Sequence, residues 1–277
     1  MKKLLKRISV IRKLIGFYRR MRLAASYYNY RYKQIYHWLF TSNEDTNFTY
    51  DLTATNIAYL ANFISVVTKK PYDECLAYIK EPQQNNELTN FILNKINSLP
   101  EEEKSVVDKR VEFGKRLGWY AFVRILKPKV VVETGIDKGL GGVLLCTALQ
   151  RNTEEGFPGR YYGTDINPNA GYLVDGVYKQ YGEILYGDSI SSLEKMNFGI
   201  DIFINDSDHS ADYEEKEYEM IKDKLNENSI IIGDNAHVTD RLSKFSIRNK
   251  RYFLFFNEMP ENHWYPGGGI GVSFTGK

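Results

Sequence analysis

The sequence predicts a doubly wound α/β protein with a mostly parallel, seven-stranded sheet. From residue 101 onward, short runs rich in β-branched residues alternate with segments of helical period. Such alternation requires right-handed crossovers, which cover both faces of a parallel sheet with helices. The last two strand-like segments, 251–259 and 269–276, leave no room for a helix between them. An antiparallel C-terminal hairpin is therefore expected to close the sheet.

The chain is expected to have three parts: a basic, aromatic helical arm at 1–40, a helical cap at 41–100 and the α/β domain at 101–277. In the arm, Leu4, Ile8, Ile11 and Ile15 recur at helical spacing, with basic residues opposite them. Residues 1–40 contain eleven Lys or Arg and no Asp or Glu, whereas the remainder carries a net charge of −9. The arm is therefore an amphipathic basic helix.

Two interpretations of the arm stay open. An amphipathic basic helix binds anionic membrane surfaces, but the same pattern suits a solvated arm or an oligomer contact. Residues 23–40 mix tyrosine with arginine, which could stack on nucleic acid, although packing on the rest of the protein is favoured. No uncharged run approaches the roughly 20 residues of a membrane span. We expect a cytoplasmic protein, for which peripheral contact at the inner membrane surface through residues 1–22 is one of the two open interpretations.

The α/β domain is expected to alternate elements in a regular order. Helices are predicted at 106–126, 170–181, 189–196 and 212–225, a glycine loop that enters a helix at 135–150, and strands at 129–134, 159–166, 183–188, 200–206 and 229–235. Cys75 and Cys146 lie far apart outside any metal-binding spacing, so they are expected to be buried free thiols.

Polar residues gather where the predicted parallel strands end. In strand order they are Glu133, Thr134 and Gly135, then Asp165, then Asp188, then Asp206 and His209, then Asp234 and Asn235. In a doubly wound sheet, ligands bind in the crevice outside the carboxyl ends of the strands. A binding site is therefore expected at this edge of the sheet.

The first strand is followed by a loop with four glycines, which lets the backbone approach a ligand closely: Gly135, Gly139, Gly141 and Gly142. The spacing is not the G-x-G-x-x-G of dinucleotide-binding proteins. Glu133, just before the loop, suits a cation better than a pyrophosphate. Asp165 is placed to accept hydrogen bonds from ribose hydroxyls, and Asp188 to contact an adenine amino group.

A series of motifs runs along this domain in the order VVVETGIDKGLGG, YYGTDI, ILYGDS, DIFINDSDHS and IIIGDN. The motifs of class I S-adenosylmethionine-dependent methyltransferases occur in the same order, and residues 110–277 resemble the Rossmann-like domain of that family. Asp137 stands where many members have a second glycine. The chain most resembles the metal-dependent sugar O-methyltransferases of macrolide and glycan tailoring. This resemblance implies an S-adenosylmethionine site formed by Glu133, Thr134, Gly135, Gly139, Asp165, Ile166, Asp188 and Ser189.

The resemblance also implies a metal site and a general base. In the metal-dependent branch, the positions of Asp206, Asp234 and Asn235 bind Mg²⁺, and oxygen donors of this kind suit such a hard cation. His209 occupies the position of the base. A Lewis-acidic cation lowers the pKa of an alcohol while a base takes its proton, and an imidazole with a pKa near ~6.5 is available for that task. The expected function is thus Mg²⁺-assisted O-methylation of a sugar, glycan or natural-product hydroxyl.

Several alternatives remain. Asp206 or Asp208 could cap a helix, Asp234 and Asn235 could form a turn, and His209 could be a structural histidine. His237 and His263 are competing bases or substrate contacts. Trp264 and Tyr265 could pack on a sugar ring or anchor the closing hairpin. Rival functions are a nicotinamide-dependent oxidoreductase, and a non-catalytic scaffold or nucleic-acid-binding protein that uses the basic N-terminus.

Overall fold

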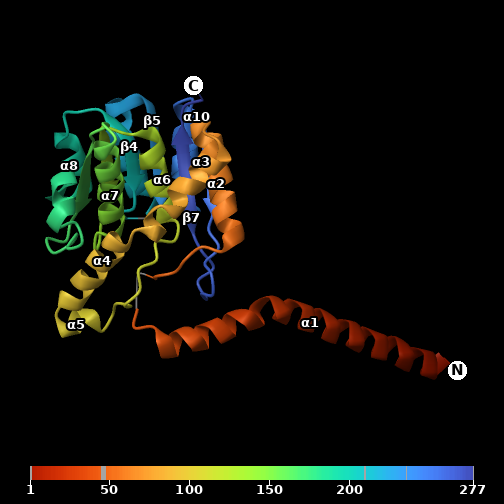
Figure 1. Cartoon of the computed structure of the whole chain (residues 1–277). Coiled ribbons are helices and arrows are strands. Elements are labelled where there is room, and N and C mark those ends of the chain that lie inside the picture. Colours follow the sequence, from red (N-terminus) through yellow and green to blue (C-terminus); the bar gives the residue numbers. More distant parts are fainter. Residues whose placement is uncertain (1, 45–47, 209, 235, 277) are drawn as a thin grey trace.

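A computed structural model describes residues 2–44, 48–208, 210–234 and 236–276, and it contains a seven-stranded sheet (Figure 1). Its strands are β1 (Val130–Thr134), β2 (Arg160–Asp165), β3 (Gly182–Tyr186), β4 (Ile200–Asn205), β5 (Leu225–Asp234), β6 (Tyr252–Asn257) and β7 (Gly269–Phe274). They lie in the order β3-β2-β1-β4-β5-β7-β6, and β7 runs antiparallel to both of its neighbours. The predicted fold, including the C-terminal hairpin, is confirmed.

Helices cover both faces of the sheet because successive side chains of a strand point to opposite faces. One face carries α2 (Ala54–Thr68), α3 (Tyr72–Lys80), α6 (Arg116–Leu126) and α7 (Leu140–Glu154), and the other carries α8 (Ser189–Lys195), α9 (Ala211–Ile221) and α10 (Arg241–Arg248). In β4, Ile202 and Ile204 enter the first core, whereas Phe203 enters the second. Successive residues of a strand therefore pack under different layers of helices.

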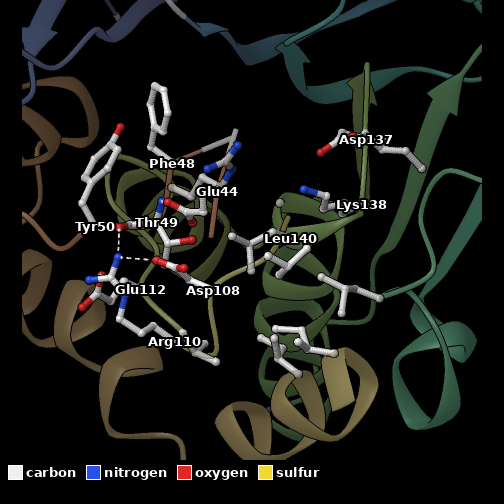
Figure 2. Close-up of a pocket in the computed structure, with 18 of the residues that line it drawn as sticks. Glu44, Phe48, Thr49, Tyr50, Asp108, Arg110, Glu112, Asp137, Lys138 and Leu140 are labelled. Atoms are coloured by element: carbon white, nitrogen blue, oxygen red, sulfur yellow. Dashed lines mark hydrogen bonds and ion pairs between the residues drawn. The ribbon is translucent and has the colours of Figure 1, made fainter. Parts of the chain in front are cut away.

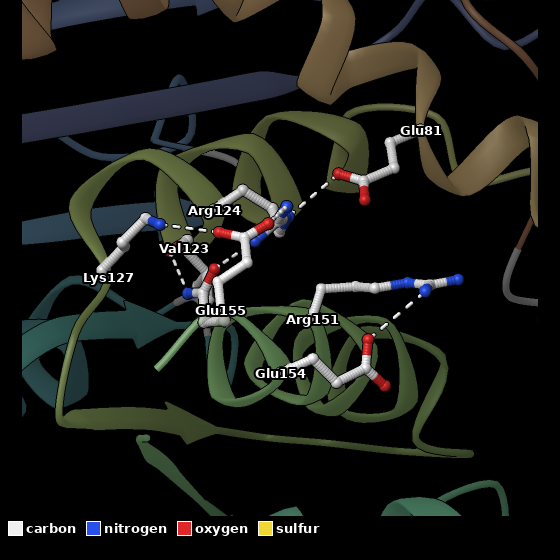
Figure 3. A network of polar contacts seen from close by, with 8 residues as sticks. Glu81, Val123, Arg124, Lys127, Arg151, Glu154 and Glu155 are labelled. Carbon is white, nitrogen blue, oxygen red and sulfur yellow. Dashed lines mark hydrogen bonds and ion pairs between the residues drawn. The ribbon is translucent and has the colours of Figure 1, made fainter. Parts of the chain in front are cut away.

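The helices of the predicted cap share a core with the α/β domain. Leu60 and Ile64 of α2 belong to the same buried cluster as Phe122 of α6 and Val131 of β1. A polar network ties α3 and α7 to α6 at their ends (Figure 3). There Arg124, which is only 3% exposed, donates to Glu81 at 2.9 Å and to Glu155 at 2.6 Å. These contacts join the cap and the domain, and the proposed boundary between them stays a prediction.

Two predicted helices are wrong in extent. The segment expected to be helical at 106–126 is an α-helix only from Arg116, because Gly114 has a φ of +51° and interrupts the turn before it. Residues 170–181 form turns and a short 3₁₀-helix, η2 (Gly176–Tyr181), since Gly171 and Gly176 both adopt positive φ. The helix α10 was not predicted. Residues 106–115 are therefore free to cross the ligand crevice.

The N-terminal region is helical, as predicted. The first helix, α1 (Lys2–Thr41), is a single element of 40 residues that extends away from the rest of the molecule (Figure 1). The cap contains α2, α3, a 3₁₀ turn η1 (Pro82–Gln84) and α4 (Asn86–Ser98), and the short helix α5 (Glu101–Lys104) follows it. Within the described part of the chain, no helix is long and apolar enough to cross a membrane. The expected cytoplasmic location stays a prediction.

Candidate active site

Two cavities adjoin at the carboxyl ends of the parallel strands. The first, of about 360 Å³, lies between these strand ends, Glu44 and the segments 48–50 and 106–112 (Figure 2). The second, of about 490 Å³, is formed by the loops that follow β1 to β4. Gly135, Asp137 and Asp206 line both cavities. The predicted crevice thus contains two compartments that meet beside Asp206.

Asp165 ends β2 in the second cavity, where its carboxylate is held in a fixed orientation. One oxygen accepts a hydrogen bond from the Asp137 backbone N–H at 2.9 Å, and the other accepts from the Asn167 N–H at 2.8 Å. Each carboxylate oxygen retains acceptor capacity for a ligand hydroxyl. The neighbouring Ile166 side chain is 80% exposed along this cavity. Both predicted residues therefore lie where a nucleoside could bind.

Asp188 and Ser189 line the same cavity. Asp188 caps α8 by accepting from the Ser191 backbone N–H at 2.8 Å, and it also accepts from the Tyr213 hydroxyl at 2.8 Å. These two hydrogen bonds, the backbone one foremost, lower the pKa of Asp188. Tyr213 lines the cavity too, and its ring was not predicted as part of the site. It projects from the first turn of α9, where sequence pattern alone gave no reason to single it out.

The glycine loop has the backbone conformation that the sequence demands. Gly135 has a φ of +79°, and a Cβ at this position would lie 2.2 Å from the Asp206 carbonyl oxygen. Asp137, which replaces a glycine of the resembled family, also adopts a positive φ of 45°. Gly139 has a φ of +88° and precedes α7 against Gly171, but it is not among the described residues that line the cavities. Its contribution is thus to the shape of the loop.

Glu133 and Thr134, at the end of β1, point to opposite faces of the sheet. Glu133 lines the first cavity, is 1% exposed and accepts from the Tyr161 hydroxyl at 2.7 Å. Burial raises its pKa to about 7, although the Tyr161 hydrogen bond opposes this shift. Thr134 is fully buried on the other face, and its hydroxyl donates to Glu217 at 3.1 Å. It therefore supports the strand end rather than lining a described cavity.

Glu217 of α9 is a buried carboxylate that joins several of these strand ends, and it was not predicted. It accepts hydrogen bonds from the hydroxyls of Thr134, Ser189 and Ser207 and from the side-chain amide of Asn205. Burial raises its pKa, while these donors oppose the shift. The sequence did contain a signal for its burial. Glu217 stands four residues before the apolar Ile221, which is buried, so both side chains lie on the covered side of α9.

Asp206 and Asp234 end β4 and β5, and the structure brings them together as expected. Their carboxyl groups are hydrogen-bonded to each other. Burial and the negative charge of Asp234 raise the pKa of Asp206 well above its usual range. Asp234 is also buried, but the positive charges of Lys115 and Arg116 outweigh that effect and lower its pKa. The pKa values of the two carboxyl groups thus shift in opposite directions.

Lys115 contributes a buried cation to this pair. Its Nζ lies 2.8 Å from Asp234 Oδ2 and 3.9 Å from Glu258 Oε1, and the residue is only 5% exposed. Burial alone would lower its pKa, but Asp234, Glu258 and Asp206 together raise it. Lys115 immediately precedes α6, and the expectation of a continuous helix through 106–126 obscured its place in the site.

The donors present are chemically suited to a hard cation. Asp234 Oδ1 is buried and has no hydrogen-bond partner among the described residues, and a divalent ion would stabilise two adjacent carboxylates. However, the described part of the chain contains no group of three or more His, Cys, Asp or Glu side chains arranged to hold a metal. Asn235 and His209, the other predicted ligand and the predicted base, lie outside the described residues.

The remaining histidine candidates and Asp208 lie in different surroundings. His237 is exposed. His263 is buried, its Nδ1 accepts from the Tyr265 backbone N–H at 3.0 Å, and burial lowers its pKa to about 4. Asp208 is exposed beside the second cavity and accepts from the Ser210 N–H at 2.8 Å. Of these two histidines, His237 therefore lies at the surface and His263 is packed in the interior.

The loop with His263 forms an aromatic cluster at the first cavity. The Trp264 ring lies 5.4 Å from Trp38 of α1 and 5.0 Å from Phe48, while Tyr265 and Phe48 line the cavity. Trp264 thus anchors the loop, and Tyr265 faces the space where a substrate could bind.

The far wall of the first cavity is polar and charged. Glu44, Asp108, Arg110 and Glu112 line it (Figure 2), and Arg110 donates to Asp108 at 2.8 Å. Burial, foremost among several causes, raises the pKa values of Glu44 and Glu112. A wall of this kind offers both donors and acceptors to a ligand rich in hydroxyl groups.

Residues 132–236, which contain all five of these parallel strand ends, match the model of a family described as a methyltransferase domain. This region is therefore similar to a methyltransferase domain. The predicted recognition of a class I methyltransferase is thereby confirmed. No curated protein sequence matches the chain.

Solved structures with the fold of this methyltransferase domain include three from bacteria. An O-methyltransferase from Streptomyces achromogenes involved in tomaymycin synthesis, solved with SAM, is 11% identical over 69% of this chain and 91% of its own, with a TM-score of 0.51. A putative caffeoyl-CoA O-methyltransferase from Staphylococcus aureus is 14% identical over 73% and 97%, with a TM-score of 0.51. A putative O-methyltransferase from Klebsiella pneumoniae is 13% identical over 73% and 96%, with a TM-score of 0.50. At these identities the similarity establishes the fold.

Proposed function

We propose that the protein transfers a methyl group from S-adenosylmethionine to a hydroxyl of a sugar, glycan or natural product. The observation that carries this proposal is the meeting of the two cavities at Gly135 and Asp206. A nucleoside in the second cavity and an acceptor in the first would then place their reacting groups beside the acid pair. When bound, the cofactor supplies an electrophilic methyl group on a sulfonium.

The second cavity has the groups that an adenosine needs. Asp165, already oriented by two backbone N–H groups, would accept hydrogen bonds from the ribose hydroxyls. Ile166 presents an exposed apolar side chain to the base, and Asp188 with Ser189 borders its polar edge. Gly135 lets the backbone approach the ligand, and the buried Glu133 would attract the cationic methionine end through the first cavity.

The first cavity would bind the acceptor. Its charged wall of Glu44, Asp108, Arg110 and Glu112 suits a compound with several hydroxyl groups, because carboxylates accept and guanidinium donates in fixed directions. Tyr265 offers an aromatic surface on the same cavity. This chemistry favours a sugar or glycan over a purely apolar acceptor.

We assign removal of the proton from the acceptor hydroxyl to His209. Lys115 and the pair formed by Asp206 and Asp234 would assist this step. The Lys115 ammonium beside Asp234 would stabilise negative charge that develops on the acceptor oxygen. Asp206, Asp234 and Asn235 would hold Mg²⁺, which would act as a Lewis acid toward the hydroxyl. The hydrogen-bonded carboxyl pair and the unpartnered oxygen of Asp234, among the residues described, support this assignment.

Calorimetric titration with S-adenosylhomocysteine, with and without Mg²⁺, tests the proposal. The wild type is expected to bind S-adenosylhomocysteine and Mg²⁺, whereas Asp206→Ala should retain the former and lose the latter. Absence of S-adenosylhomocysteine binding in the folded wild type would refute the cofactor assignment. Retained Mg²⁺ binding in Asp206→Ala would refute the metal assignment alone.

The base is tested separately. His209→Ala should bind both ligands and lose methyl transfer to a hydroxylated acceptor, whereas His237→Ala, at an exposed position, should retain it. Normal turnover in His209→Ala would exclude this residue as an essential base. The match to a methyltransferase domain gives no support to the nicotinamide-dependent oxidoreductase or the non-catalytic scaffold.

A further inference from the structure

The helix α1 exposes a series of large apolar side chains to solvent. Leu14 is 62% exposed, Phe17 61%, Val10 54%, Met21 53% and Ile11 52%. Figure 1 shows why, since this part of α1 lies well away from the sheet and its covering helices. Soluble proteins seldom leave so much contiguous apolar surface uncovered, so the helix is expected to have a binding partner.

The apolar and basic side chains occupy different sides of this helix. Ile11, Leu14, Ile15 and Tyr18 follow the spacing i, i+3, i+4, i+7 and therefore lie on one face. Val10, Phe17 and Met21 extend that face on one side. At 100° per residue, the opposite side carries Arg12, Lys13, Arg19 and Arg20. This arrangement is typical of helices that lie in the plane of a membrane interface.

The charge of the arm identifies the partner. Residues 1–40 contain eleven basic residues and no acidic one. Pairing of two copies of α1 through their apolar faces would leave both basic faces without opposite charges, whereas an anionic lipid surface neutralises the basic residues and receives the apolar face at the same time. Nucleic acid would neutralise the charge but leave the apolar face exposed to water. We propose that residues 10–21 of α1 bind the protein peripherally to an anionic lipid surface.

This helix is joined directly to the first cavity. At its other end, the Trp38 ring packs 6.0 Å from Phe48 and 5.4 Å from Trp264. Phe48 lines the first cavity. Membrane binding through residues 10–21 would therefore hold the cavity near the lipid surface by a continuous helix and an aromatic contact.

Flotation of the full-length protein with lipid vesicles tests this inference. We expect it to float with vesicles of phosphatidylcholine and phosphatidylglycerol, and to remain behind with phosphatidylcholine alone. Raising the salt concentration should weaken binding, because screening shortens the range of the attraction. The combined substitution Ile11→Ser, Leu14→Ser and Ile15→Ser should reduce partitioning by at least about tenfold, as should Lys13→Glu with Arg20→Glu.

Matched substitutions outside α1 provide the controls. Tyr59→Ser, Val66→Ser and Ile247→Ser remove three exposed apolar side chains from α2 and α10, and Lys195→Glu with Lys222→Glu reverses two exposed charges. Both control variants should float like the wild type. An unchanged thermal melting curve would show that the α1 variants remain folded.

Several results would overturn the inference. Equal flotation of the wild type and both α1 variants would exclude this helix as the binding element. Absence of flotation, together with a dimer in sedimentation velocity that the serine variant loses, would instead assign the apolar face to a second copy. Absence of flotation with salt-sensitive binding to nucleic acid would assign the basic face to that ligand.

Discussion

The Nζ of Lys115 lies 2.8 Å from Oδ2 of Asp234, in a position where both side chains are buried. The ammonium lowers the pKa of Asp234, whereas burial and the charge of Asp234 raise the pKa of Asp206. Because Lys115 comes from the turn before α6 and Asp234 from the end of β5, the ion pair also fixes the segment 106–115 across the crevice. The same ion pair thus sets the charge at the acid pair and holds the segment that crosses the crevice.

Replacement of this lysine should destabilise the fold. Lys115→Met would leave Asp234 as a buried charge without its ammonium partner, which we expect to lower the free energy of unfolding by about 3 kcal/mol. Urea denaturation of the free protein measures this loss. Lys127→Met, which removes a more exposed ion pair with Glu155, should cost less than about 1 kcal/mol. Equal losses in the two variants would show that burial of the Lys115 pair has no special effect.

The buried carboxylate of Glu217 should be essential for the order of the strand ends. Glu217→Gln preserves the shape of the side chain but places an N–H donor among four donors, which should cost about 1–3 kcal/mol of unfolding free energy. Because Ser189 and Ser207 border the second cavity, the affinity for S-adenosylhomocysteine should fall as well. Glu219→Gln, on the exposed side of the same helix, should change stability by no more than about 0.5 kcal/mol. Comparable denaturation midpoints for both variants would contradict this role.

The glycine loop should not tolerate a side chain at Gly135. In Gly135→Ala, the new Cβ would overlap the Asp206 carbonyl oxygen at 2.2 Å and also require an unfavourable positive φ. We expect a loss of more than about 2 kcal/mol in stability and of S-adenosylhomocysteine binding. Gly156→Ala is the control, because Gly156 has a φ of +90° but no atom within 4 Å of the added Cβ. It should lose only about 1 kcal/mol and bind normally.

Glu133 should make the stability of the free protein depend on pH. Its pKa is about 7 in the folded state and 4.5 as an unperturbed side chain, so the folded state binds more protons between these values. Its contribution to stability is therefore fully present below pH 4.5 and is lost as pH rises toward 7. The loss should approach about 3 kcal/mol. Urea denaturation across this pH range should show that the free energy of unfolding of the wild type falls as pH rises. In Glu133→Gln, the part of this fall that is due to Glu133 should be absent. Parallel pH profiles for the two proteins would refute the shift.

Much of the fold was predictable from the sequence because each signal is local. The β-branched runs of β1, β4 and β5 and the apolar periods of α7 and α9 identify the layers, and parallel connection brings the strand ends to one edge. Asp165, Asp206 and Asp234 could be placed at that edge for the same reason. The loop glycines were recognisable too, since positive φ at Gly135 and Gly139 favours a residue without a Cβ.

Other features depend on contacts between distant segments, so only the tertiary structure decided them. Lys115 reads as one more basic residue of a helix until Gly114 ends the preceding turn and β5 brings Asp234 beside it. The spacing of Glu217 from Ile221 indicates the covered side of α9, but its partners are established only when the ends of β1 and β4 surround it with donors. The sequence by itself determined the layers and the edge at which ligands bind. Charge balance and hydrogen-bond partners were decided by the folded structure, because they depend on distances that no local pattern encodes.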